Sequence, residues 1–224
     1  MIPWKLLSSS RTPDRKSVLT LYQRDEEYSI RVNGLELMNS RMFGSEVLLA
    51  ELPCGEIADR KNACVLIGGL GMGYTLSAAL QSLHDDAVVL LVELVPAVVE
   101  WNQGVLGPLA DHPLEDSRVR VLIDDVANVI THGKSTFDAI LLDIDNGPDS
   151  FTQDENASLY SLSGLSMIHR ALRPGGVVAV WSASSDAGFK KKLKQSSFHV
   201  IEKKVRGRTH KKGPVHTIWI AKKS

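Results

Sequence analysis

From residue 63 onwards, short apolar runs alternate with segments in which apolar residues recur at helical spacing. Such runs are typical of buried β-strands, and the segments between them are typical of helices that pack on a sheet. The expected strands are 63–67, 88–92, 118–123 and 138–142, and the expected helices are 74–83, one beginning at Pro96, and 126–132. This alternation predicts an α/β fold with a doubly wound, mostly parallel, Rossmann-like sheet.

The N-terminal part of the chain follows a strand pattern instead. Residues 17–24 and 28–32 are expected to form short strands, because a polar turn separates them and the turn residues Asn33-Gly34 follow. These strands predict a small N-terminal β-meander. We therefore expect an N-terminal β region over residues 1–45 and a nucleoside-binding, Rossmann-like catalytic domain over residues 46–224.

The C-terminal part predicts a closing hairpin. After a polar loop, the expected elements are a helix over 158–172, a helix stop at 173–176, a strand over 177–181, a Lys-rich helix near 187–195, and strands over 198–205 and 215–221. The last two strands and the turn between them predict an antiparallel edge on the otherwise parallel sheet.

Composition excludes several classes of partner. The chain has 224 residues, 43% of them hydrophobic, and its 26 Lys and Arg balance 26 Asp and Glu, so no overall charge selects nucleic acid or anionic lipid. The basic residues between 190 and 212 alternate with apolar ones and lack interleaved aromatics, which favours a solvated face over a nucleic-acid site. Two cysteines without metal-ligand spacing and no apolar run of about 20 residues fit a cytoplasmic protein with no membrane partner.

A glycine-rich turn follows the first predicted strand of the main domain. Gly69, Gly71 and Gly73 lie between the apolar run Val65-Leu-Ile67 and the predicted helix, and Glu93 ends the next strand. Glycines allow a tight turn and close approach of the backbone to a ligand, and an acid that ends the second strand can accept both ribose hydroxyls. The order predicts a nucleoside-binding βαβ unit.

Acids also end the third and fourth predicted strands. Ligands of doubly wound sheets bind at the carboxyl ends of the strands, so Asp124, Asp125 and Asp143 are candidates for the same site. An acid after the third strand can accept a hydrogen bond from an adenine amine or can cap the helix that begins at Val126, and the two roles are compatible. Asp143 follows a buried central run, where a carboxylate is costly unless it is hydrogen-bonded or binds a cation. Trp181 ends a strand at this edge and can pack there or stack on a ligand.

Together these motifs resemble spermidine synthases, the polyamine aminopropyltransferases. The resemblance runs over residues 45–182 and rests on the segments 65–73, Glu93, 118–125 and 137–143 with Gly147-Pro148. The predicted N-terminal meander resembles the small β-domain of that family, and Ser158-Leu-Tyr160 is similar to the Ser-Leu-Phe that follows its catalytic loop.

The resemblance implies specific roles for these residues. Glu93 would hold the ribose, Asp125 the adenine amine, with Asp124 beside it as a further cofactor-binding residue, and Asp143 would be the catalytic acid-base residue. Implied cofactor-binding residues are also Gly69, Gly71 and Gly73, and implied substrate-binding residues are Asp145, Asn146 and Tyr160. The family likeness further implies decarboxylated S-adenosylmethionine as the sulfonium donor, a small amine as acceptor, a homodimer, and no metal.

Three departures from the family pattern keep the reaction open. Gly71 stands where the family has an Asp that binds the aminopropyl arm, Asn146 stands where it has a second catalytic acid with Asp145 one residue earlier, and residues 37–46 lack its Gln and Tyr.

These departures leave three functional hypotheses. The first is an aminopropyltransferase with Asp143 as base. The second is a methyltransferase that uses intact S-adenosylmethionine, because Gly71 removes an acid that would repel the methionine carboxylate. The third is a nucleoside-binding protein that has lost catalysis. A metal-dependent methyltransferase would need an Asp-Asn pair after the next strand, and residues 181–185 supply none.

Overall fold

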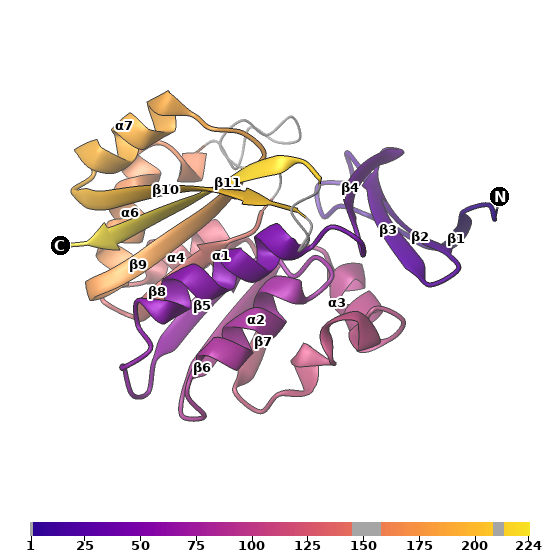
Figure 1. Cartoon of the computed structure of the whole chain (residues 1–224), viewed down its shortest axis with the longest axis horizontal. Helices are drawn as coiled ribbons and strands as arrows, with labels where there is room; N and C mark the ends of the chain where they lie inside the picture. The colour runs from indigo at the N-terminus through magenta and orange to yellow at the C-terminus, as the bar shows by residue number, and fades with distance from the viewer. Residues whose placement is uncertain (1, 145–157, 208–212) are drawn as a thin grey trace.

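The computed structural model describes residues 2–144, 158–207 and 213–224, and it contains two β-sheets (Figure 1). The larger has seven strands in the order β10-β11-β9-β8-β5-β6-β7. Its strands are β5 (Cys64–Gly68), β6 (Val88–Glu93), β7 (Val119–Ile123), β8 (Phe137–Leu142), β9 (Leu172–Ser182), β10 (Phe198–Arg206) and β11 (Val215–Lys223). The strands β7, β6, β5, β8 and β9 run parallel, and β11 is antiparallel to both β9 and β10. The predicted doubly wound sheet with a closing hairpin is therefore confirmed.

Helices cover both faces of this sheet. On one face lie α1 (Gly44–Gly55), α2 (Tyr74–Ser82) and α3 (Pro96–Gln103), followed by two 3₁₀ turns at Gly107–Ala110 and Pro113–Glu115. On the other lie α4 (Val126–His132), α6 (Leu162–Ala171) and α7 (Ala187–Gln195). Helices α1 and α2 are in front of the sheet in Figure 1, and α4 and α6 are behind it. Among the described residues no helix is both long and apolar enough to cross a membrane.

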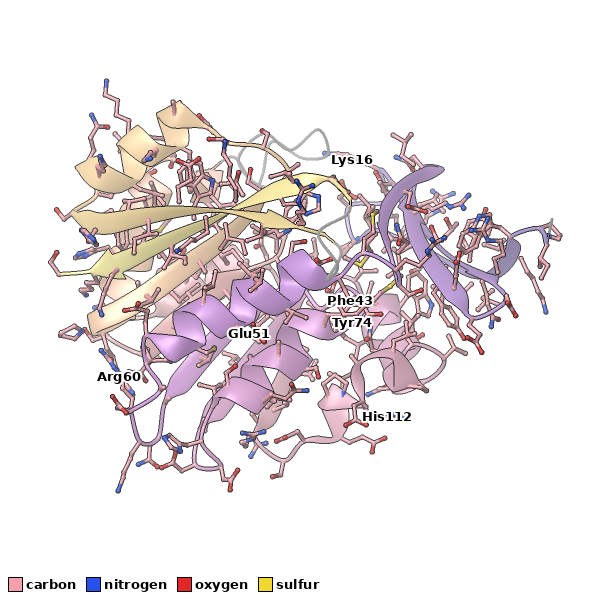
Figure 2. The ribbon with its side chains drawn as sticks, in the orientation of Figure 1. Lys16, Phe43, Glu51, Arg60, Tyr74 and His112 are labelled. Carbon is pink, nitrogen blue, oxygen red and sulfur yellow. The ribbon has the colours of Figure 1, made fainter. Side chains whose placement is uncertain are left out.

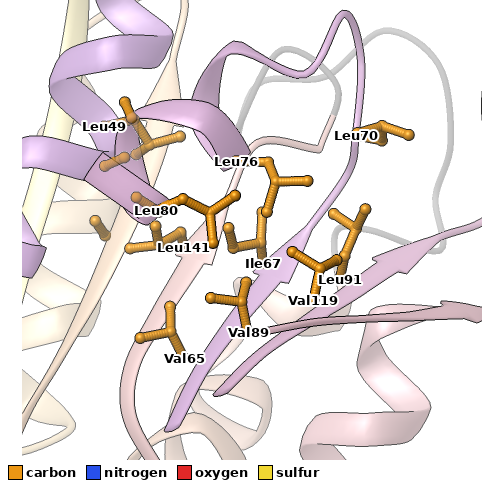
Figure 3. Packing of buried hydrophobic residues seen from close by; sticks show 14 of the residues in the cluster. Leu49, Val65, Ile67, Leu70, Leu76, Leu80, Val89, Leu91, Val119 and Leu141 are labelled. Atoms are coloured by element: carbon orange, nitrogen blue, oxygen red, sulfur yellow. The ribbon is translucent and has the colours of Figure 1, made fainter. Parts of the chain in front are cut away.

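Alternate residues of each strand feed the two cores. Val65 and Ile67 of β5 pack under α1 and α2, whereas Leu66 between them packs against α4 and α6. Figure 3 shows the first core, in which Leu49 of α1 and Leu76 of α2 lie over the sheet. Because both faces are covered, the central strands must be apolar throughout, which is why they read as continuous hydrophobic runs in the sequence.

The start of α1 is fixed against the start of α2. Phe43 precedes α1, and its ring stacks on Tyr74, with centroids 4.3 Å apart and an interplanar angle of 15°. Figure 2 shows these two side chains lying together. The Gly44 N–H also donates to the Gly207 carbonyl at 2.8 Å, which ties the same end of α1 to the end of β10. Helix α1 was not among the elements expected from the sequence.

The N-terminal sheet has four antiparallel strands in sequence order. They are β1 (Lys5–Arg11), β2 (Val18–Arg24), β3 (Glu27–Val32) and β4 (Leu35–Asn39). The meander was predicted with only β2 and β3, because β1 is mostly polar and β4 is short. Its buried residues Leu19, Leu21, Ile30 and Val32 belong to the same core as α1 and α2. The division into residues 1–45 and 46–224 stays a proposal, because the sheet ends at Asn39 and α1 begins at Gly44.

One predicted boundary was wrong. Residues 173–176 were expected to end a helix, but α6 ends at Ala171 and β9 already begins at Leu172. The segment forms an irregularity in the β8–β9 register, opposite Asp138. Arg173 donates to Asp138 at 2.7 Å, and Arg60 donates both to Asp138 at 2.6 Å and to the Pro174 carbonyl at 2.9 Å. These ion pairs hold the Pro-Gly-Gly stretch alongside the sheet, an effect that local turn propensity does not reveal.

Candidate active site

A cavity of about 210 Å³ lies at the carboxyl ends of the parallel strands. The loops after β5, β6, β7 and β8 form one side, and the N-terminal sheet, α1 and the end of β9 form the other. Its described lining residues are Thr12, Ser17, Leu19, Ile30, Val32, Leu37, Met38, Glu46, Gly69, Gly71, Val92, Glu93, Leu94, Val95, Val98, Asp124, Asp125, Val126, Asp143, Ile144 and Trp181. The location is the one that ligands occupy in doubly wound folds.

The glycine loop has three residues in the left-handed region. The φ angles of Gly69, Gly71 and Gly73 are 89°, 53° and 85°. A Cβ at Gly69 would collide with the Asp143 carbonyl oxygen, so only glycine lets the loop pass the end of β8. Gly69 and Gly71 line the cavity, whereas Gly73 packs beside Asn102. The Asn102 amide donates to the Gly71 carbonyl at 2.9 Å and thereby holds the loop.

Glu93 is fixed at the end of β6. One carboxylate oxygen accepts the Leu70 N–H at 2.8 Å, and the other accepts the Val95 N–H at 2.9 Å. The side chain is 8% exposed and lines the cavity. The structure thus joins the predicted acid of the second strand to the glycine loop.

Asp124 and Asp125 also line the cavity, and each has a local structural role. Asp125 Oδ1 accepts the Ala127 N–H at 2.8 Å, so the predicted helix-capping role is confirmed. Asp124 Oδ1 accepts from the Asn128 amide at 2.9 Å and from the Asp125 N–H at 2.7 Å. The Asn128 bond is the main reason that the pKa of Asp124 lies below its ordinary value, so this group stays charged.

Asp143 lies after the central strand β8, as predicted, and faces the cavity. Its Oδ2 accepts from the Thr75 hydroxyl at 2.7 Å. Burial raises the pKa of Asp143 to about 6, although the Thr75 bond acts in the opposite direction. A carboxylate with such a pKa is mostly ionised at neutral pH and can still exchange a proton.

Glu46 is a fifth acidic residue of the cavity, and the sequence reasoning missed it. It lies in the first turn of α1, lines the cavity, and accepts from the Ser45 hydroxyl at 2.6 Å. Burial, and then the charge of Asp143, raise the pKa of Glu46 to about 7. Ser45 also contacts Nδ1 of His216 at 2.9 Å, and the His216 ring packs against Trp181. The only signal in the sequence was Glu46 itself, because helix α1 was not predicted.

The N-terminal wall was missed as well. Thr12, Ser17, Leu37 and Met38 reach the cavity from the small sheet, and Met38 Cε lies 2.7 Å from where a Cβ of Gly71 would be. The alternation of residues along a strand identifies its apolar face, but it does not show that this face forms a wall of the cavity in another part of the protein.

Comparison with known proteins agrees with this geometry. The family model described as the spermine/spermidine synthase domain matches residues 42–211. This chain belongs to the spermine/spermidine synthase family.

Curated relatives of this synthase family member are polyamine aminopropyltransferases. Polyamine aminopropyltransferase 2 of Pseudomonas aeruginosa is 32% identical over 127 residues, which cover 52% of this chain and 32% of that protein. The polyamine aminopropyltransferase of Prochlorococcus marinus strain MIT 9313 is 34% identical over 125 residues, covering 55% of this chain and 41% of the relative. The chain thus spans less than half the length of these two relatives.

Solved structures of the synthase family share the fold. Spermidine synthase from Thermotoga maritima superposes with a TM-score of 0.76 at 19% identity, covering 98% of this chain and 73% of that one. A spermidine synthase in complex with the transition state analogue AdoDATO gives a TM-score of 0.75 at 20% identity, with the same coverage.

Not every predicted site residue of this synthase family member reaches the cavity. Tyr160 is 2% exposed and packs edge-on against Phe189 with ring centroids 5.5 Å apart, in the core between α6, α7 and the sheet. It is not among the described lining residues, because its ring is taken up by that core. Asp145 and Asn146 lie outside the described residues.

The charge of the cavity has one sign. Glu46, Glu93, Asp124, Asp125 and Asp143 line it, and the described lining residues include no Lys, Arg or His. Several carboxylates in a concave site with low-dielectric walls produce a strongly negative potential. The cavity of this synthase family member is therefore suited to cationic ligands.

Proposed function

We propose that this chain is an aminopropyltransferase, which binds decarboxylated S-adenosylmethionine in the cavity and transfers the aminopropyl group to a small amine. The observation that carries the proposal is the five carboxylates with no cationic side chain among the described lining residues. Both substrates are cations at neutral pH, since an alkyl amine has a pKa near 10.

The same observation separates this substrate from intact S-adenosylmethionine. The intact molecule ends in a carboxylate, which five acids would repel in a partly desolvated cavity. The decarboxylated molecule has only the sulfonium and an ammonium group. Without the carboxylate, the acids of the cavity attract the aminopropyl chain instead of repelling the chain that carries it.

The residues present fit the decarboxylated nucleoside. We assign the ribose hydroxyls to Glu93 and the adenine amine to Asp124 and Asp125, with the backbone of Gly69 and Gly71 along the nucleoside. These acids are held by backbone or amide donors, so they do not need to reorganise when the ligand enters.

Asp143 is assigned as the base. The sulfonium supplies a leaving group: the new carbon–nitrogen bond forms as the carbon–sulfur bond breaks, and its electron pair stays on sulfur as a thioether. The amine must lose one proton in this reaction. Asp143 can accept that proton because Thr75 holds its carboxylate at the cavity wall and its pKa is about 6.

A methyltransferase is the second candidate, and one observation favours it. Gly71 brings no acid to the cavity, and the thioether of Met38 packs where its side chain would be. The methionine chain of S-adenosylmethionine would meet an apolar wall if it passed this point. The acids elsewhere in the cavity argue against this candidate, because they would repel the carboxylate at the end of that chain.

Calorimetric titration with methylthioadenosine and with S-adenosylhomocysteine decides between these candidates, because each is the leaving product of one reaction. We expect tighter binding of methylthioadenosine, followed by turnover of decarboxylated S-adenosylmethionine with a panel of amines, detected by mass spectrometry. Tighter binding of S-adenosylhomocysteine would favour the methyltransferase. Binding of methylthioadenosine without turnover of any amine would indicate a nucleoside-binding protein that has lost catalysis.

Two further parts of the proposal have simple tests. We propose a homodimer on the basis of family likeness, and sedimentation equilibrium measures the mass directly. We also propose that the reaction needs no metal, so turnover should be unchanged after treatment with EDTA.

A further inference from the structure

We propose that Glu46 and Asp143 act as one carboxylate pair that binds the primary ammonium group of an alkylamine, with Glu46 as the residue that makes the cavity select such a group. The inference rests on the proposed function and adds the chemistry of recognition to it.

The two acids reach the same cavity from different elements, the charge of Asp143 acts on Glu46, and Thr75 contacts the backbone of Glu46 and the side chain of Asp143. The Thr75 hydroxyl lies 2.7 Å from Oδ2 of Asp143 and 3.4 Å from the backbone carbonyl of Glu46. Oε2 of Glu46 accepts from Ser45 at 2.6 Å. Within the part of the chain that the structure describes, Oδ1 of Asp143 accepts no hydrogen bond, and the Glu46 carboxylate accepts only from Ser45 and from its own N–H, so both acids keep acceptor capacity for a ligand.

The Thr75 contact stabilises the ionised form of Asp143. A hydroxyl has one hydrogen, and the shorter of its two contacts, 2.7 Å against 3.4 Å, is the one to Oδ2 of Asp143. Asp143 is therefore the member of the pair that ionises more readily, and Glu46, whose pKa the charge of Asp143 raises, is the member that holds a proton when no cation is bound.

The described groups that surround the pair do not compensate its negative charge. Tyr74 on α2 has a pKa raised to about 12, first by burial and then by the charge of Glu46, so it is neutral. His216 on β11 reaches Glu46 through Ser45, and burial lowers its pKa, which disfavours a charged ring there. The other acids of the cavity are Glu93, Asp124 and Asp125, which already accept backbone N–H groups or an amide. Because the described lining residues include no Lys, Arg or His, we take the cation that neutralises the pair from the ligand.

Binding of an ammonium group has a defined proton balance. At pH 6.5 the pair carries about one proton, since the pKa of Glu46 is about 7 and that of Asp143 is about 6. An ammonium group favours two ionised carboxylates, so the proton leaves to solvent while the ammonium keeps its own three. Recognition should therefore be accompanied by proton release.

A series of three probes identifies which ammonium group is recognised. Methylthioadenosine has no ammonium, S-adenosyl-3-thiopropylamine adds only the aminopropyl ammonium, and 1,4-diaminobutane titrated into the methylthioadenosine complex reports the acceptor site. Each titration is performed at pH 6.5 in two buffers of different ionisation enthalpy, which gives the number of protons released. The variants are Glu46→Gln and, as matched control, Glu51→Gln on the exposed side of the same helix (Figure 2).

For wild type we expect release of about half a proton to one proton with at least one ammonium-bearing probe and none with methylthioadenosine. Glu46→Gln should weaken that probe about tenfold or more and abolish the release, because one charge-assisted contact is lost, while methylthioadenosine binding stays unchanged. Glu51→Gln should behave as wild type. The probe whose binding is weakened shows whether the pair binds the aminopropyl ammonium or the ammonium of the acceptor amine.

Other outcomes contradict the inference in distinguishable ways. If wild type binds all probes and Glu46→Gln changes neither affinity nor proton release, the pair does not bind the ammonium, although the proposed function stands. The same holds if methylthioadenosine is weakened equally, because Glu46 would then only support the cavity. Failure of wild type to bind any nucleoside would overturn both proposals.

Wild-type protein alone supplies a second test if Glu46→Gln does not fold. Affinity for the ammonium-bearing probe should rise about tenfold as the pH increases from 5 to 8 and level off above about 7, because the ammonium itself does not titrate in this range. A flat profile would overturn the inference.

Discussion

Thr75 and Asp143 are joined by a hydrogen bond of 2.7 Å between the hydroxyl and Oδ2. Thr75 lies in the first turn of α2, directly after the glycine loop, and Asp143 follows the central strand of the sheet. The bond connects the loop assigned to the nucleoside with the carboxylate assigned to the chemistry. Two predictions concern these two residues.

Asp143→Asn keeps the size of the side chain but removes its basicity. We expect kcat to fall about 10²- to 10⁴-fold, the usual contribution of a general base, while Kd for methylthioadenosine changes less than about threefold. Steady-state kinetics and calorimetry on the same preparation measure both. Equal losses in turnover and nucleoside binding would contradict the assignment of Asp143 as base.

Thr75→Val replaces the hydroxyl by a methyl group at a buried position. The Thr75 bond lowers the pKa of Asp143, so its loss should raise that pKa above about 6. The acidic limb of the kcat/KM profile should therefore move up by about half a unit to one unit, with a smaller effect at pH 8.5. An unshifted limb would show that Asp143 is not the group that titrates in the profile.

Glu46 should make the stability of the fold depend on pH. Its folded-state pKa of about 7 lies above the ordinary value of 4.5, so its favourable contribution is complete below about pH 4.5 and is lost as the pH rises through about 7. Glu46→Gln removes this loss. The variant should be more stable than wild type by up to about 3 kcal/mol at pH 8 and equal to it at pH 4.

Urea unfolding at the two pH values measures this difference, with Glu51→Gln as control. Any contribution of His216 to the pH dependence of stability is the same in both proteins and cancels in the comparison. A variant that is less stable than wild type at pH 8 would show that Glu46 is already compensated in the folded protein.

Gly69 and Gly71 should differ in their tolerance of a side chain. A Cβ at Gly69, where φ is 89°, meets the backbone of Asp143, whereas a Cβ at Gly71, where φ is 53°, meets the flexible end of Met38. We expect Gly69→Ala to cost about 3 kcal/mol or more and to abolish nucleoside binding, and Gly71→Ala to cost about 1–2 kcal/mol. Thermal unfolding and methylthioadenosine titration test this order, and similar costs at both positions would contradict the described loop.

Asp138 should matter for stability but not for binding. Its carboxylate accepts from Arg60, Arg173 and the Cys64 N–H, and its side chain is 3% exposed. Asp138→Asn leaves two partly exposed guanidinium groups without their anion, and because solvent screens them we expect a loss of about 1–3 kcal/mol. Circular dichroism during urea unfolding measures the loss. Methylthioadenosine affinity in the folded variant should stay within about twofold of wild type, because Asp138 does not line the cavity.

The carboxyl-end acids could be predicted because position in the sheet is a local property. Glu93, Asp125 and Asp143 each follow an apolar strand directly, so the parallel sheet necessarily brings them to one edge. Tyr160 is different, because the direction of its ring depends on how α6 and α7 pack. The similarity of Ser158-Leu-Tyr160 to a family motif therefore did not indicate where the Tyr160 ring points.

The sequence by itself determined the sheet, the glycine loop and the acids at the strand ends, because periodicity, turn chemistry and the order of elements are written in consecutive residues. Only the tertiary structure decided what closes the cavity. Glu46 lies within the electrostatic influence of Asp143, and Met38 covers Gly71, because α1 and the N-terminal sheet pack onto elements far away in the chain. Such contacts depend on the packing of whole elements rather than on local pattern, and here that packing brings together the carboxylates from which we infer ammonium recognition.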